Sequence, residues 1–231
     1  MKLNLRLLSF VPRWQPRFVT RIAAEDRCHL NGLAIVDGQP KYVTALGATD
    51  EPRGWKSGKA EGGILLDVPS SEIIAQGFAM PHSPRWHAGK LWVLNSGEGE
   101  LQVIDPETGK RETVVSLPGY TRGLAFHGQH AFVGLSKIRE KEEFGGLPIE
   151  SRVKDLQCGI WIIDLQRGSA IEFMAFEAGC TEVFAVEVLA GIRWPAIIGF
   201  KQETINGIFV VPPDGSVRTE RTGAGGEGAF A

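Results

Sequence analysis

The sequence has few cysteines, and their arrangement argues against two kinds of cross-linked scaffold. Cys28, Cys158 and Cys180 are an odd number at wide spacings, and no CxxC pair occurs. This pattern argues against a disulfide framework and against a cysteine zinc site. We expect all three cysteines to be small buried hydrophobic side chains in a protein of the reducing cytoplasm.

Long apolar runs are also missing. The apolar residues near the start are interrupted by Arg6, Pro12 and Arg13. No run elsewhere approaches the ~18 apolar residues that a membrane-spanning helix needs. The sequence therefore predicts neither a signal peptide nor a membrane partner.

The chain has no excess of positive charge. It contains 25 basic and 27 acidic residues, which gives a formal net charge of −2. Because phosphate binding needs clustered Lys and Arg, we expect no nucleic-acid partner. A GxSxG nucleophile elbow, a P-loop and an HExxH motif are absent as well, so the reactions that these motifs carry are not predicted. The sequence leaves the cofactor unknown.

Glycine and proline, in contrast, are abundant and scattered. The 29 glycines and 13 prolines suit a fold with many tight turns. Helical periodicity is nearly absent, and we expect the charged stretch 136–157 to be a long ordered loop with one helical turn at most. Elsewhere short apolar runs bounded by Gly, Pro, Asp or Asn predict β-strands.

The predicted strands recur as two alternating kinds of hairpin. The first kind joins a short strand to a second apolar strand through a turn glycine, which is Gly38, Gly89 or Gly128 in the clearest copies. Its copies lie at residues 32–47, 83–97, 123–136 and, more loosely, 184–199. The second kind starts with an apolar strand that ends at a polar turn. These strands and turns lie at residues 63–71, 101–109, 159–168 and 207–215.

Three aspartates mark the turns of the second kind of hairpin. Asp67, Asp105 and Asp164 resemble a catalytic series in the sequence. Their position at turns instead predicts that they accept hydrogen bonds from backbone N–H groups.

Two hairpins together give four strands per unit at a period of ~40–50 residues, which is typical of a β-propeller. We predict an all-β fold, a β-propeller of four-stranded antiparallel blades with about four recognisable blades and a partial N-terminal one. A two-sheet sandwich of unrelated hairpins is the alternative, but it does not predict that the two hairpin kinds alternate. We expect residues 1–222 to form one domain and residues 223–231 to be a disordered glycine-rich tail.

Several segments together resemble the DUF4915 family, a domain of unknown function. They include residues 9–14 (SFVPRW), 80–86 (MPHSPRW), 91–97 (LWVLNSG) and 121–125 (TRGLA), and the resemblance covers nearly the whole chain. It implies a propeller and no known reaction. Members of the family usually carry roughly a hundred more residues ahead of Leu8, enough for about two further blades. The resemblance therefore implies a shortened propeller or a fragment, and an exposed blade edge would favour self-association.

Propellers bind ligands where the loops that enter the inner strands converge on the central channel. Aligning the hairpins by their turn glycines places several polar side chains ahead of the inner strands, and Asn95 and Ser136 at the ends of second strands. We predict His82 and His29 as catalytic residues. We predict six further residues as ligand-binding: Asn31, Arg85, Asn95, Arg122, Ser136 and Glu182.

The residue types suggest the chemistry of this site. Arg85 and Arg122 are suited to hold a carboxylate, phosphate or sulfate through paired hydrogen bonds. His82 or His29 would act as a general base or, together with Glu182, as a metal ligand. Structural roles are the alternative for each of these residues, since a turn histidine or asparagine often only satisfies backbone groups.

Two functions remain open at this point. The first is binding of a small anionic molecule or a peptide terminus at the central channel, with a metal- or histidine-assisted reaction as an extension. The second is a non-catalytic scaffold that binds a protein partner through the charged insertion at residues 137–144.

Overall fold

The computed structural model describes residues 2–4, 9–137 and 145–193. The chain divides into two compact units, one formed by Pro16–Gly191 and the other by Met1–Gln15 with Ile192–Ala231. In the second of these, β1 (Lys2–Asn4) pairs antiparallel with β2 (Ser9–Val11). Among the described residues no helix is long and apolar enough to cross a membrane.

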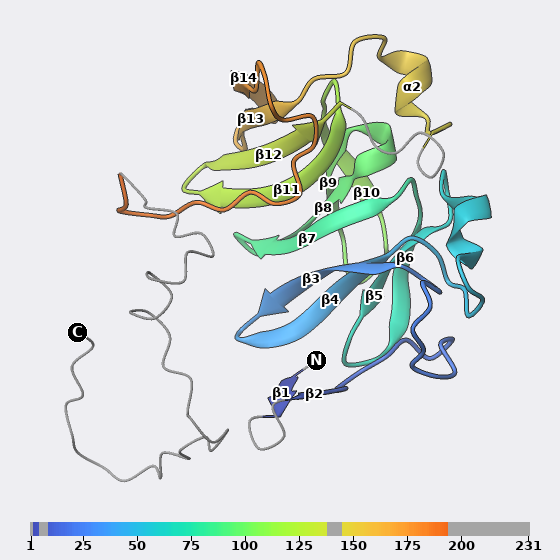
Figure 1. The fold of residues 1–231 in the computed structure, drawn as a ribbon. Coiled ribbons are helices and arrows are strands. Elements are labelled where there is room, and N and C mark those ends of the chain that lie inside the picture. Colours follow the sequence, from blue (N-terminus) through green and yellow to red (C-terminus); the bar gives the residue numbers. More distant parts are fainter. Residues whose placement is uncertain (1, 5–8, 138–144, 194–231) are drawn as a thin grey trace, which may run out of the picture. The chain divides into compact units, whose positions relative to one another are not determined.

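Three four-stranded antiparallel sheets make up the unit Pro16–Gly191, and the strands of each sheet follow one another in chain order (Figure 1). Blade 1 consists of β3 (Leu30–Val36), β4 (Gln39–Ala45), β5 (Gly63–Asp67) and β6 (Glu72–Phe78). Blade 2 consists of β7 (Pro81–His87), β8 (Lys90–Asn95), β9 (Glu100–Ile104) and β10 (Arg111–Ser116). Blade 3 consists of β11 (Tyr120–His127), β12 (His130–Ser136), β13 (Gly159–Asp164) and β14 (Ser169–Ala175).

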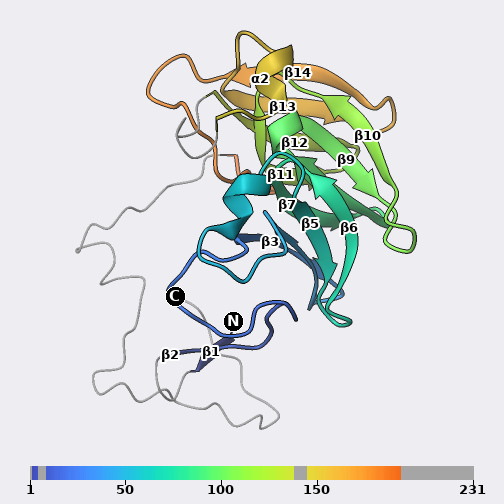
Figure 2. The same ribbon diagram turned by 90° about the vertical axis from the view of Figure 1, so that its right-hand side faces the viewer.

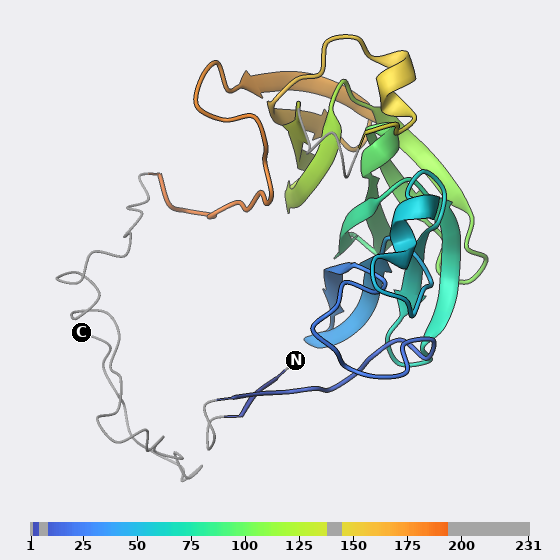
Figure 3. The same ribbon diagram turned by 45° about the vertical axis from the view of Figure 1, so that its right-hand side comes forward.

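The first strand of each sheet is the inner strand of the blade. Strand β7 packs between β3 and β11, so the three inner strands lie side by side. The last strands, β6, β10 and β14, lie away from them on the outer side (Figures 2 and 3). This order, with inner strands gathered and outer strands spread, confirms the predicted propeller-like fold.

The alternation of side chains along β8 explains how the blades pack. Leu91 and Val93 face blade 1, where they join a buried cluster with Phe78. Trp92 and Leu94, on the opposite face of the strand, join the cluster that contains residues of blade 3. Because successive side chains of a strand point to opposite faces, one continuous apolar run fills both interfaces of the middle blade.

A third cluster closes the end of the blades where the longer loops lie. It brings together Leu46, Trp55, Met80, Tyr120, Leu147 and Ile149. Short helical turns supply part of it, namely η1 (Gly54–Gly58) and α2 (Ile149–Arg152), and η2 (Ser96–Glu98) lies in the corresponding loop of blade 2. The single turn α2 agrees with the prediction for residues 136–157, of which 138–144 lie outside the described residues.

The predicted hairpins agree with the structure in three of the four copies. Gly38, Gly89 and Gly128 have φ angles of 73°, 72° and 56°, in the left-handed region that these turns require. In the fourth copy, residues 184–193 form no strand, and residues 194–199 lie outside the described part of the chain, as do residues 207–215 and the predicted tail.

The three turn aspartates have the predicted structural role. Asp67 accepts a hydrogen bond of 2.9 Å from the backbone N–H of Ser70, and Asp105 accepts one of 2.9 Å from that of Glu107. Asp164 accepts two such bonds, of 2.9 and 3.1 Å, from Gln166 and Arg167. These bonds agree with the structural role that the turn positions predict.

Candidate functional site

Each inner strand carries one extra residue at the same level. In blade 1, Leu30 to Gly32 on β3 stands opposite only Ala45 and Thr44 on β4. In blade 2, β7 advances three positions from His82 to Arg85 while β8 advances two. Blade 3 repeats this between Thr121 and Leu124 on β11. A β-bulge re-aims the side chain at the extra residue and often accompanies a functional site.

Two predicted site residues, Asn31 and Arg122, lie within these bulges, and two more, His82 and Arg85, flank the bulge of β7. Asn31 lies in the bulge of β3, Ser83 and Pro84 in that of β7, and Arg122 and Gly123 in that of β11. The prediction had placed Asn31, His82, Arg85 and Arg122 in loops that enter the inner strands, and this was wrong. They belong to the strands themselves, because each inner strand begins before its bulge: β3 at Leu30, β7 at Pro81 and β11 at Tyr120.

Hydrogen bonds join the bulged strands to one another. Asn31 accepts a bond of 2.7 Å from the hydroxyl of Thr44 and donates one of 3.0 Å to the carbonyl of Pro81, which connects β3 to β7. The backbone N–H of Gly123 donates a bond of 3.1 Å to the hydroxyl of Ser83, which connects β11 to β7. These bonds fix the three inner strands in register at the level of the bulges.

Glycine is required at these contacts because the strands approach closely. A Cβ atom on Gly32 would lie 2.4 Å from Cδ of Pro84 on the next inner strand. A Cβ atom on Gly123, which has a φ angle of +82°, would lie 2.7 Å from the carbonyl carbon of Ala185. Gly32 therefore allows β7 to approach β3 closely, and Gly123 allows the segment around Ala185 to approach β11 in the same way.

Residues 181–188, which we call the strap, lie beside β11. Their position relative to β11 corresponds to the position of β7 relative to β3. Val183 and Val186 are buried against blade 3 with Ala125 and Cys158. The backbone N–H of Val183 donates a hydrogen bond of 2.9 Å to the hydroxyl of Ser136. The strap follows the position of a fourth inner strand without pairing to any described strand, and Ser136 serves to hold it.

Arg122 is the most distinctive charged group of the bulges. Its guanidinium is half-buried and lies 4.4 Å from the centroid of the Phe184 ring of the strap. Burial lowers the pKa of Arg122, and the charge of Glu182 acts in the opposite direction. The group stays protonated at neutral pH, and within the described residues it donates no hydrogen bond. An arginine in this state keeps its N–H donors for another acceptor.

Arg85, also on β7, already has partners. Its Nη1 donates a bond of 3.1 Å to the carbonyl of Pro84, and its Nη2 lies 3.4 Å from a carboxylate oxygen of Glu187 on the strap. The Glu187 side chain is 70% exposed. Such an exposed ion pair is weak, so an incoming anion could replace Glu187.

His29 forms a pair with a carboxylate. Its Nδ1 lies 2.8 Å from Oδ2 of Asp26, which also accepts a bond of 2.9 Å from the indole N–H of Trp55. The His29 and Trp55 rings lie 4.9 Å apart. Because a carboxylate only accepts hydrogen bonds, Nδ1 carries the proton, and Nε2 is the basic nitrogen of the neutral ring.

His82 and Asn95 are placed inside the protein. Both have an exposed fraction of only 3%. Asn95 accepts a bond of 2.8 Å from the backbone N–H of Ala79 and donates one of 3.3 Å to Glu100, so its polar atoms support the turn between blades 1 and 2. The catalytic roles of His82 and His29 stay predictions.

The described residues contain no group of three or more His, Cys, Asp or Glu side chains that could hold a metal ion. Sequence reasoning did not find Asp26, Phe184 or Glu187. The spacing of Asp26 and His29 was the one available signal for the pair, whereas Phe184 and Glu187 reach Arg122 and Arg85 only through the path of the strap.

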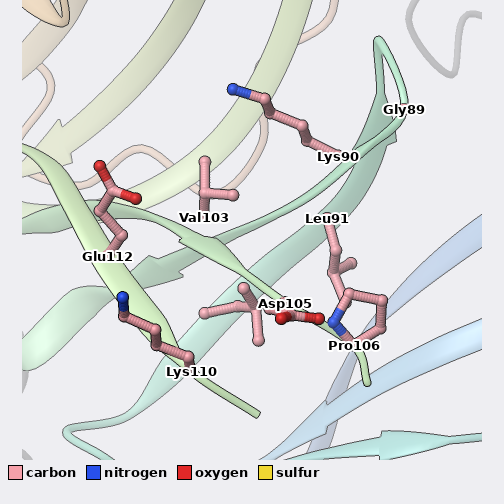
Figure 4. A pocket seen from close by; sticks show the side chains of 9 residues that line it. Gly89, Lys90, Leu91, Val103, Asp105, Pro106, Lys110 and Glu112 are labelled. Carbon is pink, nitrogen blue, oxygen red and sulfur yellow. The ribbon is translucent and has the colours of Figure 1, made fainter. Parts of the chain in front are cut away.

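A groove of about 280 Å³ lies elsewhere on blade 2 (Figure 4). Two lysines and two carboxylates line it with Leu91, Val103 and other residues: Lys90, Lys110, Asp105 and Glu112. The charges balance, Asp105 already binds its own turn, and none of the predicted site residues takes part. The groove therefore offers no selective site for an anion.

The order of the strands within and between blades defines a β-propeller-like protein with a bulged inner-strand level. The chain belongs to the DUF4915 family, a domain of unknown function, whose model matches residues 5–198. No curated protein matches the chain.

Solved structures with partial similarity include two designed proteins and one bacterial protein. The computationally designed Ika4 protein is 15% identical, with a TM-score of 0.40 and coverage of 68% of this chain and 78% of that one. The designed Ika8 protein is 15% identical, with a TM-score of 0.38 and coverage of 68% and 39%. TolB from Acinetobacter baumannii is 18% identical, with a TM-score of 0.36 and coverage of 54% and 29%.

Proposed function

We propose that this protein binds a small anionic ligand, or the carboxylate of a peptide terminus, at the bulged level of its inner strands. Arg122 is the residue that holds the anion. The single observation that carries this proposal is its half-buried guanidinium, which rests on Phe184 and donates no hydrogen bond within the described residues. The cytoplasm, expected from the sequence, is the proposed location.

The surroundings of Arg122 support this role. Desolvation strengthens an ionic hydrogen bond, because water no longer competes for the donors. The contact with Phe184 limits the motion of the guanidinium, so less conformational entropy is lost when a ligand binds. Arg85 would add a second cation once the anion replaces Glu187.

A reaction is an extension of this proposal. The Asp26–His29 pair has the arrangement of an oriented general base, since the carboxylate fixes the ring and leaves Nε2 to take a proton. His29→Ala would then abolish turnover of a bound ligand while leaving its affinity within about twofold.

A thermal-shift screen tests the binding proposal. Its panel contains inorganic phosphate, sulfate, small mono- and dicarboxylates, and a short peptide with either a free or an amidated C-terminus. At a hundredfold excess over Kd, one anion class should raise the melting temperature by about 5–10 °C.

The matched variants are Arg122→Gln and Arg167→Gln. Arg167 lies in a turn of blade 3 with 77% of its side chain exposed, so its loss is a control for net charge. Arg122→Gln should abolish the shift and Arg167→Gln should keep it. No shift with any anion, or equal shifts in both variants, would instead favour the scaffold function.

A further inference from the structure

Two of the three cysteines come together although 22 positions separate them in the sequence. The sulfur atoms of Cys158 and Cys180 lie 3.9 Å apart. Cys158 precedes β13 directly and is buried, whereas Cys180 lies just before the strap and is half-buried. The sequence prediction of three buried cysteines was therefore wrong for Cys180.

The chain is folded locally so that the two thiols meet. After β14, the backbone N–H of Phe176 donates a bond of 3.1 Å to the carbonyl of Cys158. The following turn contains Gly179, whose φ angle is +76°, and it returns Cys180 to the same place. The Cys180 thiol also lies 3.2 Å from the carbonyl oxygen of Glu182 in the strap.

We propose that Cys158 and Cys180 form a reversible disulfide that fastens the strap to blade 3. The sulfur atoms must approach from 3.9 Å to the bonding distance of about 2.05 Å. Cys180 lies outside any helix or strand, so a change of its side-chain rotamer and a small shift of its turn supply this movement. The cysteine pair contains none of the residues of the proposed anion site, so this proposal does not rest on that one.

The co-reactant is a low-molecular-weight disulfide, such as oxidised glutathione. The more accessible Cys180 thiolate attacks one of its sulfurs, which forms a mixed disulfide and releases one thiol. The Cys158 thiolate then attacks the sulfur of Cys180 and releases the second thiol. The protein loses two electrons and two protons, and the oxidant is reduced to two thiols.

The environment of Cys158 slows closure of the disulfide. Burial, together with the neighbouring Cys180 thiol, raises the pKa of Cys158 to about 11. Since the thiolate is the attacking species, the second step is slow at neutral pH. Closure is therefore slow, and it is favoured when the pool of oxidised thiols rises relative to the reduced pool.

Thiol counting on the full chain tests the proposal. The reduced protein is treated with oxidised glutathione, and its free thiols are counted after denaturation at low pH. The count should fall from three to one, and the mass of the monomer should decrease by two hydrogen atoms. Peptide mapping should find Cys158 joined to Cys180, and dithiothreitol should restore three thiols. The buried Cys28 is the internal control and should stay reduced.

Proteolysis reports whether the disulfide fastens the strap. A glutamate-specific protease should cut after Glu182 or Glu187 roughly tenfold more slowly in the oxidised protein. Cys180→Ser, which keeps the size of the side chain, should be cut at one rate before and after oxidation.

Three results would overturn the proposal. They are a thiol count that stays at three, a stable glutathione adduct on Cys180 without closure, and a disulfide that involves Cys28 or links two chains. The thiol count, peptide map and monomer mass of the wild type together decide between these outcomes even if a variant fails to fold.

Discussion

The backbone N–H of Gly123 donates a hydrogen bond of 3.1 Å to the hydroxyl of Ser83, and this bond connects the bulges of two neighbouring inner strands. Ser83 has a φ angle of +51° and Gly123 one of +82°. Both conformations are unfavourable for most residues, and they are kept where surrounding structure compensates for the strain. The bond is part of what places Arg122 beside the strap.

Ser83→Ala removes the acceptor of this bond and leaves the N–H of Gly123 without it. We expect the free energy of unfolding to fall by roughly 1–2 kcal/mol, because a partly buried donor loses its partner. Urea denaturation measures the change. Ser151→Ala is the control, since the Ser151 hydroxyl bonds to Pro148 on the exposed side of α2 and its loss should cost under about 0.5 kcal/mol. Equal losses would show that the Ser83 bond does not support the inner strands.

Gly123→Ala tests the close approach of the strap to β11. The new Cβ atom would lie 2.7 Å from the backbone of Ala185. The alanine would also have to adopt the left-handed backbone conformation of Gly123, whose φ angle is +82°. We expect a loss of about 2–4 kcal/mol, since strain and overpacking add.

Gly128→Ala, in the turn between β11 and β12, separates the cost of the left-handed conformation from the cost of the steric clash. Gly128 also has a positive φ angle, 56°, but no atom lies within 4 Å of its would-be Cβ. This variant should lose only about 1 kcal/mol, the cost of the conformation alone. If the two alanine variants were equally stable in urea, the strap would not pack on β11 as described.

The sequence was sufficient to predict the blades but not the details of the site. Turn glycines such as Gly38 and turn aspartates such as Asp105 determine local conformation, so the turns that they form can be predicted from neighbouring residues. The bulges are different, because an extra residue is defined only by the partner strand. Sequence reasoning found Arg122 as a candidate. It did not find the bulge that holds Arg122 or the contact of its guanidinium with Phe184, because both depend on segments far away in the chain.

The burial of His82 and Asn95 could not be predicted for a similar reason. Both were expected at a ligand site, and both are 3% exposed. A polar residue near the end of a strand either faces the channel or satisfies a buried backbone group. Only the packing of the next blade decides this, as the bond from Ala79 to Asn95 illustrates.

The pH dependence of stability should show the contribution of Asp67. Burial opposes ionisation of this carboxyl, yet Lys41, 2.6 Å away, and the N–H of Ser70 outweigh it and lower the pKa of Asp67. The unfolded chain therefore binds more protons than the folded protein at acidic pH. The stabilisation is complete above the unfolded pKa of about 4 and is lost as the pH falls through the lower folded pKa.

Asp67→Asn should remove this contribution. We expect a loss of about 1 kcal/mol at pH 7 that shrinks toward zero as the pH falls from about 4 to 2, measured by urea denaturation at each pH. Asp155→Asn changes an exposed carboxylate that has no hydrogen bond or ion pair within the described residues, and its curve should follow that of the wild type. A constant difference between wild type and Asp67→Asn at every pH would contradict the assignment.

The most direct test of the anion site is calorimetric titration of wild type, Arg122→Gln and Arg167→Gln with the anion that gives the largest thermal shift. We predict one binding site per chain in the wild type and in Arg167→Gln, with Kd values that agree within about twofold. Arg122→Gln should bind at least tenfold more weakly, which corresponds to the loss of about 1.4 kcal/mol or more. Equal affinity of all three proteins would contradict the claim that Arg122 holds the ligand.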